Sequence, residues 1–117
     1  MKQGFTSHHF TRSRGWKRPD DPSSDEVVPM GGHTFGIGFS ISWQNGPLGR
    51  GVDRTLPNGA FVEDIIDAAR DRIEHYQTLF PCAENDEALE HLRAALTALD
   101  RRTKDREARK VEGTHAR

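Results

Sequence analysis

The chain has 117 residues, 33% of them hydrophobic and 30% charged, so it has room for one small domain and excludes a long multidomain enzyme. Its apolar runs span only a few residues, whereas a membrane span needs roughly 20, so we expect no membrane segment. No apolar stretch follows Lys2, and the single cysteine, Cys82, cannot form an internal disulfide. These features favour a reducing cytoplasm.

The net charge of the whole chain is −1, but successive segments carry net charges of opposite sign. Residues 1–57 carry 7 basic and 5 acidic side chains, residues 58–99 carry 3 and 9, and residues 100–117 carry 7 and 4. The overall charge argues against a general electrostatic grip on nucleic acid. So polar a chain buries a limited core, which predicts that it gains stability by forming an oligomer.

Residues 1–31 show neither a helical nor a strand period and contain Pro19, Pro22 and Pro29. We expect a flexible arm whose deletion leaves folding unchanged. The neighbouring His8 and His9 have no further ligands beside them, so we expect no metal site there.

Residues 32–117 are expected to form one domain. From His33 to Trp43 large apolar residues alternate with small ones, which predicts a single strand with one buried face. The turn-forming residues 44–47 follow, and residues 48–56 are expected to return as a second strand.

Two helices should follow. Asn58 has the side chain of an N-cap, and an apolar stripe from Val62 to Tyr76 predicts a helix that ends at Phe80, before Pro81. A second helix should start near Asn85, and its stripe comprises Leu89, Leu92, Leu96 and Leu99. The short connection predicts an antiparallel hairpin. The fold class is therefore α+β: an N-terminal arm, a short antiparallel β-sheet and a long antiparallel two-helix hairpin.

The second helix should continue past its apolar stripe, because residues 100–109 hold no helix breaker and several i,i+4 ion pairs. Its arginines suit phosphate groups, and Asn85 would add donors at the helix N-terminus. Asn85 and Arg106 nevertheless lie about 30 Å apart on one helix at 1.5 Å per residue. A pocket that contains both requires two subunits.

Signatures of enzymes are missing from the sequence: it has no phosphate-binding loop, no zinc-spaced Cys/His cluster and no nucleophile elbow. Cys82 lies between His75 and His91 along the chain, but nothing near it favours a nucleophile over an idle thiol. We expect neither catalysis nor a cofactor.

Four spaced motifs resemble those of the phage anti-Thoeris and anti-CBASS hairpin family. They are WQNGPLGRG at 43–51, PNGAFVED at 57–64, FxCxEN at 80–85 and RTxxRxxRxVEGTH at 102–115. The similarity departs from the family at Lys110, which is usually glycine, and at His75, which is often phenylalanine.

This resemblance implies an immune-evasion sponge in the cytoplasm of the infected bacterial host. It implies dimers that can assemble into hexamers, and intersubunit pockets that hold cyclic ADP-ribose isomers or cyclic oligonucleotides without cleaving them. By motif position, the implied nucleotide-binding residues are His75, Asn85, Arg102, Thr103, Arg106, Gly113 and Thr114, with Arg50 as a weaker candidate. Two alternatives remain open from the residues: a phage structural or assembly protein, and a small nucleic-acid-binding regulator, although nucleic acid is the less expected partner.

Overall fold

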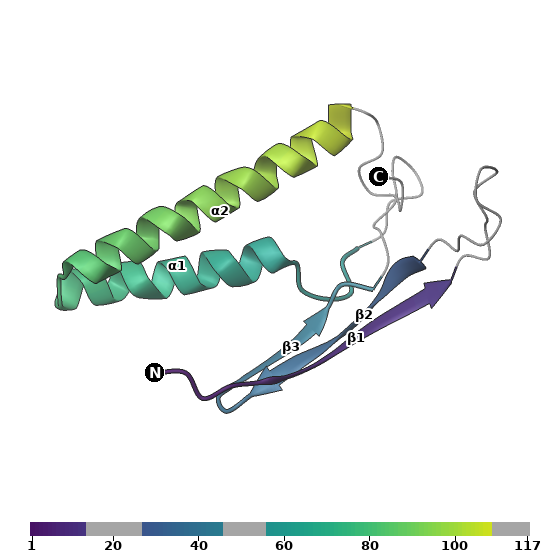
Figure 1. The fold of residues 1–117 in the computed structure, drawn as a ribbon, viewed down its shortest axis with the longest axis horizontal. Helices are drawn as coiled ribbons and strands as arrows, with labels where there is room; N and C mark the ends of the chain where they lie inside the picture. Colours follow the sequence, from purple (N-terminus) through teal and green to yellow (C-terminus); the bar gives the residue numbers. More distant parts are fainter. Residues whose placement is uncertain (14–26, 46–55, 109–117) are drawn as a thin grey trace. The chain divides into compact units, whose positions relative to one another are not determined.

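The computed structural model describes residues 1–13, 27–45 and 56–108 (Figure 1). Three strands are followed by two helices, which confirms the predicted α+β class. The described residues up to Ala60 form one compact unit, and those from Phe61 onward form another, so each unit is described by itself. In the described part of the chain no helix is both long and apolar enough to cross a membrane.

The first unit is an antiparallel sheet in the order β1-β2-β3. Its strands are β1 (Thr6–Ser13), β2 (Val27–Gly36) and β3 (Phe39–Trp43). The prediction of an arm without strands is wrong for residues 6–13 and 27–31, because backbone pairing with β2 orders a segment that has no strand period of its own. Deletion of residues 1–30 would remove β1 and its pairing with β2, so we now expect this deletion to destabilise the sheet. Residues 14–26 of the expected arm lie outside the described residues.

The alternating segment 33–43 forms two strands instead of the predicted one. A two-residue turn at Ile37 and Gly38 separates β2 from β3, and Gly38 adopts a φ of +87°, which a glycine tolerates without a Cβ clash. The turn reverses the chain so that Gly36 pairs with Phe39 and Phe35 pairs with Ser40. The apolar residues of this segment are therefore divided between both faces of the sheet. The predicted strand over 48–56 falls almost wholly outside the described residues.

One face of the sheet carries a chain of side-chain hydrogen bonds across all three strands. Thr34, at 7% exposure, lies on the middle strand. Its Oγ1 accepts a 2.7 Å hydrogen bond from Trp43 Nε1 and lies 2.7 Å from Ser7 Oγ. The one hydroxyl thus links β1 to β3 through β2.

The segment after β3 is tied back to the sheet by amide side chains. Asn58 accepts a 2.7 Å hydrogen bond from the Asn45 backbone N–H and donates one of 3.0 Å to the Asn45 carbonyl. Gly59 lies so close to β3 that an added Cβ would meet the Trp43 carbonyl oxygen at 2.5 Å. The prediction that Asn58 caps the first helix is therefore wrong, because the N-cap position of α1 belongs to Phe61.

The second unit is a helical hairpin of α1 (Val62–Leu79) and α2 (Ala83–Ala108), which lie side by side in Figure 1. The predicted end of the first helix at Phe80 is confirmed, and α2 begins two residues before the predicted Asn85. Leu89 is the most buried apolar side chain of the described hairpin, at 4% exposure. Ile66 and Ile73 of α1 and Leu92, Leu96 and Leu99 of α2 are half-buried. The predicted stripe of α2 therefore packs as a whole, whereas the predicted stripe of α1 packs only in part, because Val62, Ile65 and Tyr76 are exposed.

The Thr34 hydroxyl is testable by isosteric replacement. Thr34→Val leaves the Trp43 indole N–H without its acceptor, so we expect the free energy of unfolding to fall by about 1–3 kcal/mol. Ser42→Ala, at an exposed position of the same sheet, should change it by less than about 0.5 kcal/mol. Urea unfolding followed by tryptophan fluorescence measures both. Equal effects of the two variants would contradict a stabilising role for the Thr34 bonds.

Candidate functional site

Two of the expected nucleotide-binding residues, His75 and Asn85, lie at the turn end of the hairpin. His75 is exposed on the last turns of α1, and its ring centroid lies 6.2 Å from that of Tyr76. The Arg72 guanidinium carbon lies 4.8 Å from the centre of the Tyr76 ring. This end of α1 therefore exposes two flat rings next to a cation, which suits an aromatic anion.

Asn85 occupies the first turn of α2 and is half-buried. Its backbone N–H donates to Cys82 Sγ at 3.4 Å, so the cysteine sits in the N-cap position. This contact partly corrects the expectation that Asn85 offers both backbone and side-chain donors, because its backbone N–H already has a partner. The side-chain amide is the group left for the expected contact. Cys82 itself is an exposed free thiol.

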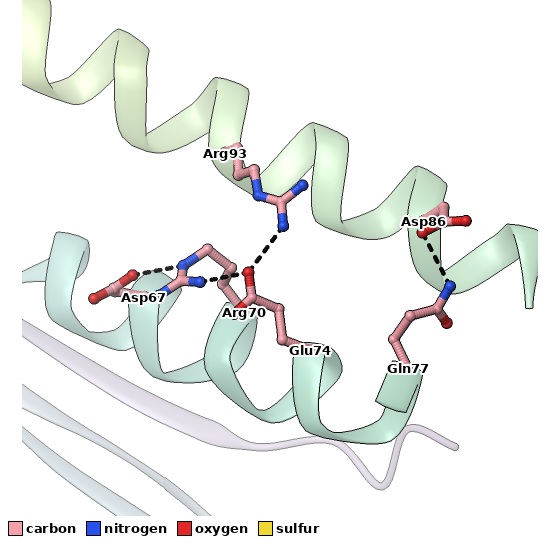
Figure 2. Close-up of polar contacts among 6 residues, drawn as sticks. All are labelled: Asp67, Arg70, Glu74, Gln77, Asp86 and Arg93. Atoms are coloured by element: carbon pink, nitrogen blue, oxygen red, sulfur yellow. Dashed lines mark hydrogen bonds and ion pairs between the residues drawn. The ribbon is translucent and has the colours of Figure 1, made fainter. Parts of the chain in front are cut away.

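Gln77 closes the three-residue connection between the helices, a role that the sequence analysis missed. Its Oε1 accepts from the Cys82 backbone N–H at 3.1 Å, and its Nε2 donates to the Cys82 carbonyl at 3.1 Å. The same Nε2 lies 2.9 Å from Asp86 Oδ1 on α2 (Figure 2). One side-chain amide therefore holds the turn and the first turn of α2 together. Sequence offers no signal for it, because glutamine is common on helix surfaces.

Glu74 links the two helices further from the turn. Its Oε1 lies 2.7 Å from Arg70 Nη1 on α1 and 2.8 Å from Arg93 Nη2 on α2, while Arg70 Nε also donates to Asp67 (Figure 2). The i,i+4 spacing of Arg70 and Glu74 was visible in the sequence. The contact with Arg93 was not, because it depends on how the helices are aligned.

Hydrogen bonds from Arg93 and then Arg70 lower the pKa of the Glu74 carboxyl, and bonds to Asp67 and Glu74 raise the pKa of Arg70. An open groove of about 370 Å³ adjoins this network. Its lining comprises Glu74, Gln77, Thr78, Asp86, Leu89 and Arg93. Glu74 and Arg93 already pair with each other, and Asp86 accepts a hydrogen bond from Gln77, so the groove itself is a poor anion site.

The remaining described candidates, Arg102, Thr103 and Arg106, lie on the last turns of α2. The predicted extension of this helix past Leu99 is confirmed as far as Ala108. Arg102 and Thr103 are exposed and Arg106 is half-buried. One of the i,i+4 ion pairs predicted within residues 100–109 is present, between Asp100 and Lys104 at 3.0 Å.

The structure does not bring the two groups of candidates together within one chain. Asn85 and Arg106 are 21 residues apart on one continuous helix, which corresponds to about 31 Å at 1.5 Å per residue. His75 lies at the same end as Asn85, because α1 and α2 run antiparallel. Arg50, Gly113 and Thr114 lie outside the described residues. Within those residues no group of three potential metal ligands comes together.

A continuous helical hairpin with an arginine-bearing end defines the structural class, and comparison with known proteins gives the family. Residues 37–104, more than half of the chain, match the family described as Acb2/Tad1, hairpin domain. The protein therefore belongs to the Acb2/Tad1 hairpin-domain family. It is also 39% identical over 77 residues to a protein of Bacillus phage SBSphiJ7 named Thoeris anti-defense 1. That alignment covers 65% of this chain and 51% of the relative, so the chain spans about half of the relative's length.

The Glu74 network predicts a pH dependence of hairpin stability. Because the pKa of Glu74 is lower in the folded state, its stabilisation is present above the ordinary carboxyl value of 4.5 and is lost as pH falls through the folded pKa. Glu74→Gln removes this titration, so the variant should lose less stability than the parent between neutral pH and about pH 3.

Urea unfolding of the helices, followed by circular dichroism at the two pH values, gives the measurement. Glu90→Gln, at an exposed position of α2, is the matched control and should behave as the parent does. A parent and a Glu74→Gln variant with the same acid sensitivity would show that the two arginine contacts do not stabilise the hairpin.

Proposed function

We propose that this protein is a phage immune-evasion protein that binds a host cyclic nucleotide signal and withholds it from its effector without cleaving it. The name of the phage relative and the family membership support the anti-defence role. The observation that carries the binding chemistry is the continuation of α2 beyond Leu99, where the helix presents Arg102 and Arg106. Planar guanidinium groups donate paired hydrogen bonds to phosphate oxygens.

The mechanism is mass action. A protein that binds its ligand tightly, at a concentration above that of the ligand, lowers the free concentration of the signal and leaves the effector unoccupied. Such a protein needs no nucleophile, general base or metal. It needs donors for the phosphates and flat side chains for the bases, and the two ends of the hairpin supply one kind each.

A complete pocket would form between two copies of the chain. The ring-bearing end of one hairpin, with His75, Tyr76 and Asn85, would face the arginine-bearing end of another. An exposed apolar stripe on α1 supports such pairing, since residues at this spacing form one seam along a helix. The exposed members of this α1 seam are Val62, Ile65, Tyr76 and Leu79.

The oligomeric state is the first requirement of this proposal. Light scattering at micromolar concentration should give at least twice the 13.2 kDa mass of one chain. Leu79→Lys places a charge in the exposed α1 seam and should shift the protein toward the monomer, whereas Thr97→Lys on an exposed position of α2 should not. A parent that is monomeric would remove the intersubunit pocket and the mechanism built on it.

The arginine end is tested by ligand binding. Charged hydrogen bonds contribute about 1.5–3 kcal/mol each, so Arg106→Ala should weaken binding roughly ten- to a hundredfold while the melting temperature stays close to that of the parent. Calorimetry with cyclic ADP-ribose isomers and with cyclic di- and trinucleotides measures the affinity. Lys104→Ala is the matched control, because Lys104 lies on the same turns and pairs with Asp100.

Chromatography of the released ligand then separates sequestration from catalysis. Recovery of the intact nucleotide supports the proposal, and a hydrolysed product would make the protein an enzyme. If Arg106→Ala and Lys104→Ala weaken nucleotide affinity equally, the weaker binding would be due to the change in net charge and not to a specific Arg106 contact. If no member of the panel binds, a phage assembly role becomes the better account.

A further inference from the structure

The sheet has a second face whose chemistry differs from the hydrogen-bonded face. Because paired residues of adjacent strands share a face, the register places Thr6 with Phe35, His8 with His33, and Phe35 with Ser40. Phe10 joins this group, since its ring meets that of His33. We call the four rings His8, Phe10, His33 and Phe35 the aromatic face.

The four rings form two contacting pairs. The His8 and Phe35 centroids lie 6.5 Å apart with planes at 28°, and those of Phe10 and His33 lie 5.8 Å apart at 87°. All four residues are exposed, with Phe10 at 50% and Phe35 at 46%. Cross-strand packing therefore holds the rings in place while a large part of their area stays open to a flat ligand.

The net charge of the unit that carries the aromatic face suits an anion better than that of the hairpin. The described residues of this unit, 1–13, 27–45 and 56–60, contain Lys2 and Arg12 but neither aspartate nor glutamate. The described hairpin, residues 61–108, has 7 basic and 12 acidic side chains, a net charge of −5. Over the whole of residues 1–60 the sequence has 7 basic and 5 acidic side chains, a net charge of +2. A polyanion would therefore be repelled less by this unit than by the hairpin.

We propose that the aromatic face binds single-stranded nucleic acid, with bases stacked on its exposed rings. Aromatic side chains on a sheet stack unpaired bases with little dependence on sequence, and the bases of a duplex are not available for this. The exposed hydroxyls of Thr6, Ser40 and Ser42 supply hydrogen-bond partners beside the rings. This binding is independent of the cyclic nucleotide pocket proposed for the hairpin.

A second copy of the sheet is a poorer occupant of the same face. Packing two aromatic faces together would bury the imidazoles of His8 and His33 together with three hydroxyls, and buried polar groups destabilise an interface unless each finds a partner. A base offers both a flat apolar surface and hydrogen-bonding edges. The mixed ring and hydroxyl composition therefore favours the nucleic acid.

The test uses the full-length protein and a fluorescein-labelled oligoadenylate of about eight nucleotides, a length within the usual range for such sites. Fluorescence anisotropy at low salt should show binding to the single strand and at least tenfold weaker binding once the strand is annealed to its complement. Loss of one stacked base corresponds to roughly five- to 150-fold weaker binding, which is the effect expected for Phe35→Thr. Phe35→Tyr keeps a ring and should retain affinity.

Phe39→Thr is the matched control, because Phe39 is 42% exposed on a strand of the same sheet and pairs with Gly36 on the opposite face. It should bind the oligoadenylate within about twofold of the parent. Circular dichroism tests whether both threonine variants keep the sheet, which we expect because threonine favours strands. Should either variant unfold, His8→Ser and Phe35→Tyr provide the comparison.

Four results would overturn the proposal: no binding of the oligoadenylate by the parent, equal affinity for single strand and duplex, equal losses in Phe35→Thr and Phe39→Thr, or a smaller oligomer in Phe35→Thr. The last result would assign the aromatic face to contact between copies. An Arg106→Ala variant that binds the oligoadenylate as the parent does would support a site separate from the hairpin. Failure here leaves the calorimetric result for cyclic nucleotides unaffected, so the two proposals can fail independently.

Discussion

The hydrogen bonds of the Gln77 side chain decide how the helical unit is arranged. By pairing with both backbone groups of Cys82 and with Asp86, this amide closes a connection of only three residues. So short a connection leaves the helices no choice but to run antiparallel. It also sets their alignment, which places Glu74 of α1 beside Arg93 of α2. The ion pair between the two helices, Glu74 with Arg93, therefore depends on the turn.

The same arrangement separates the candidate binding groups. The antiparallel helices hold His75 and Asn85 at the turn, while α2 carries Arg102 and Arg106 past the last packed leucine. A rigid helix cannot bend these two ends toward one ligand. If both ends take part in binding, the fold requires a second subunit, and the exposed apolar seam of α1 offers a surface for it.

The sheet makes different use of its two faces. One face joins Ser7, Thr34 and Trp43 in a hydrogen-bonded line that fixes the strands to one another. The other carries rings and hydroxyls that remain exposed. The hydrogen bonds that join the strands and the rings of the proposed binding site thus lie on opposite faces of the sheet.

The sequence by itself determined the helical hairpin and its arginine-bearing end, because these depend on local signals. Phe80 before Pro81 stops α1, and the leucine spacing and charge pairs carry α2 as far as Ala108. The residues proposed for both ends of the candidate site come from the family resemblance of the motifs, and their role in binding stays a prediction. Their separation along one helix followed from helical rise alone.

The sequence predicted that a short antiparallel sheet precedes the hairpin, but tertiary structure decided which segments form its strands and which contacts join the helices. β1 forms because β2 supplies hydrogen bonds to a segment with no strand period, and a turn at Gly38 splits what looked like one strand from His33 to Trp43. Asn58 has the side chain of an N-cap, yet that side chain forms hydrogen bonds with the backbone of Asn45 instead of with the first turn of α1. Apart from the local turn at Gly38, these outcomes depend on a partner that is well separated along the chain, and a local pattern carries no information about which partner that is.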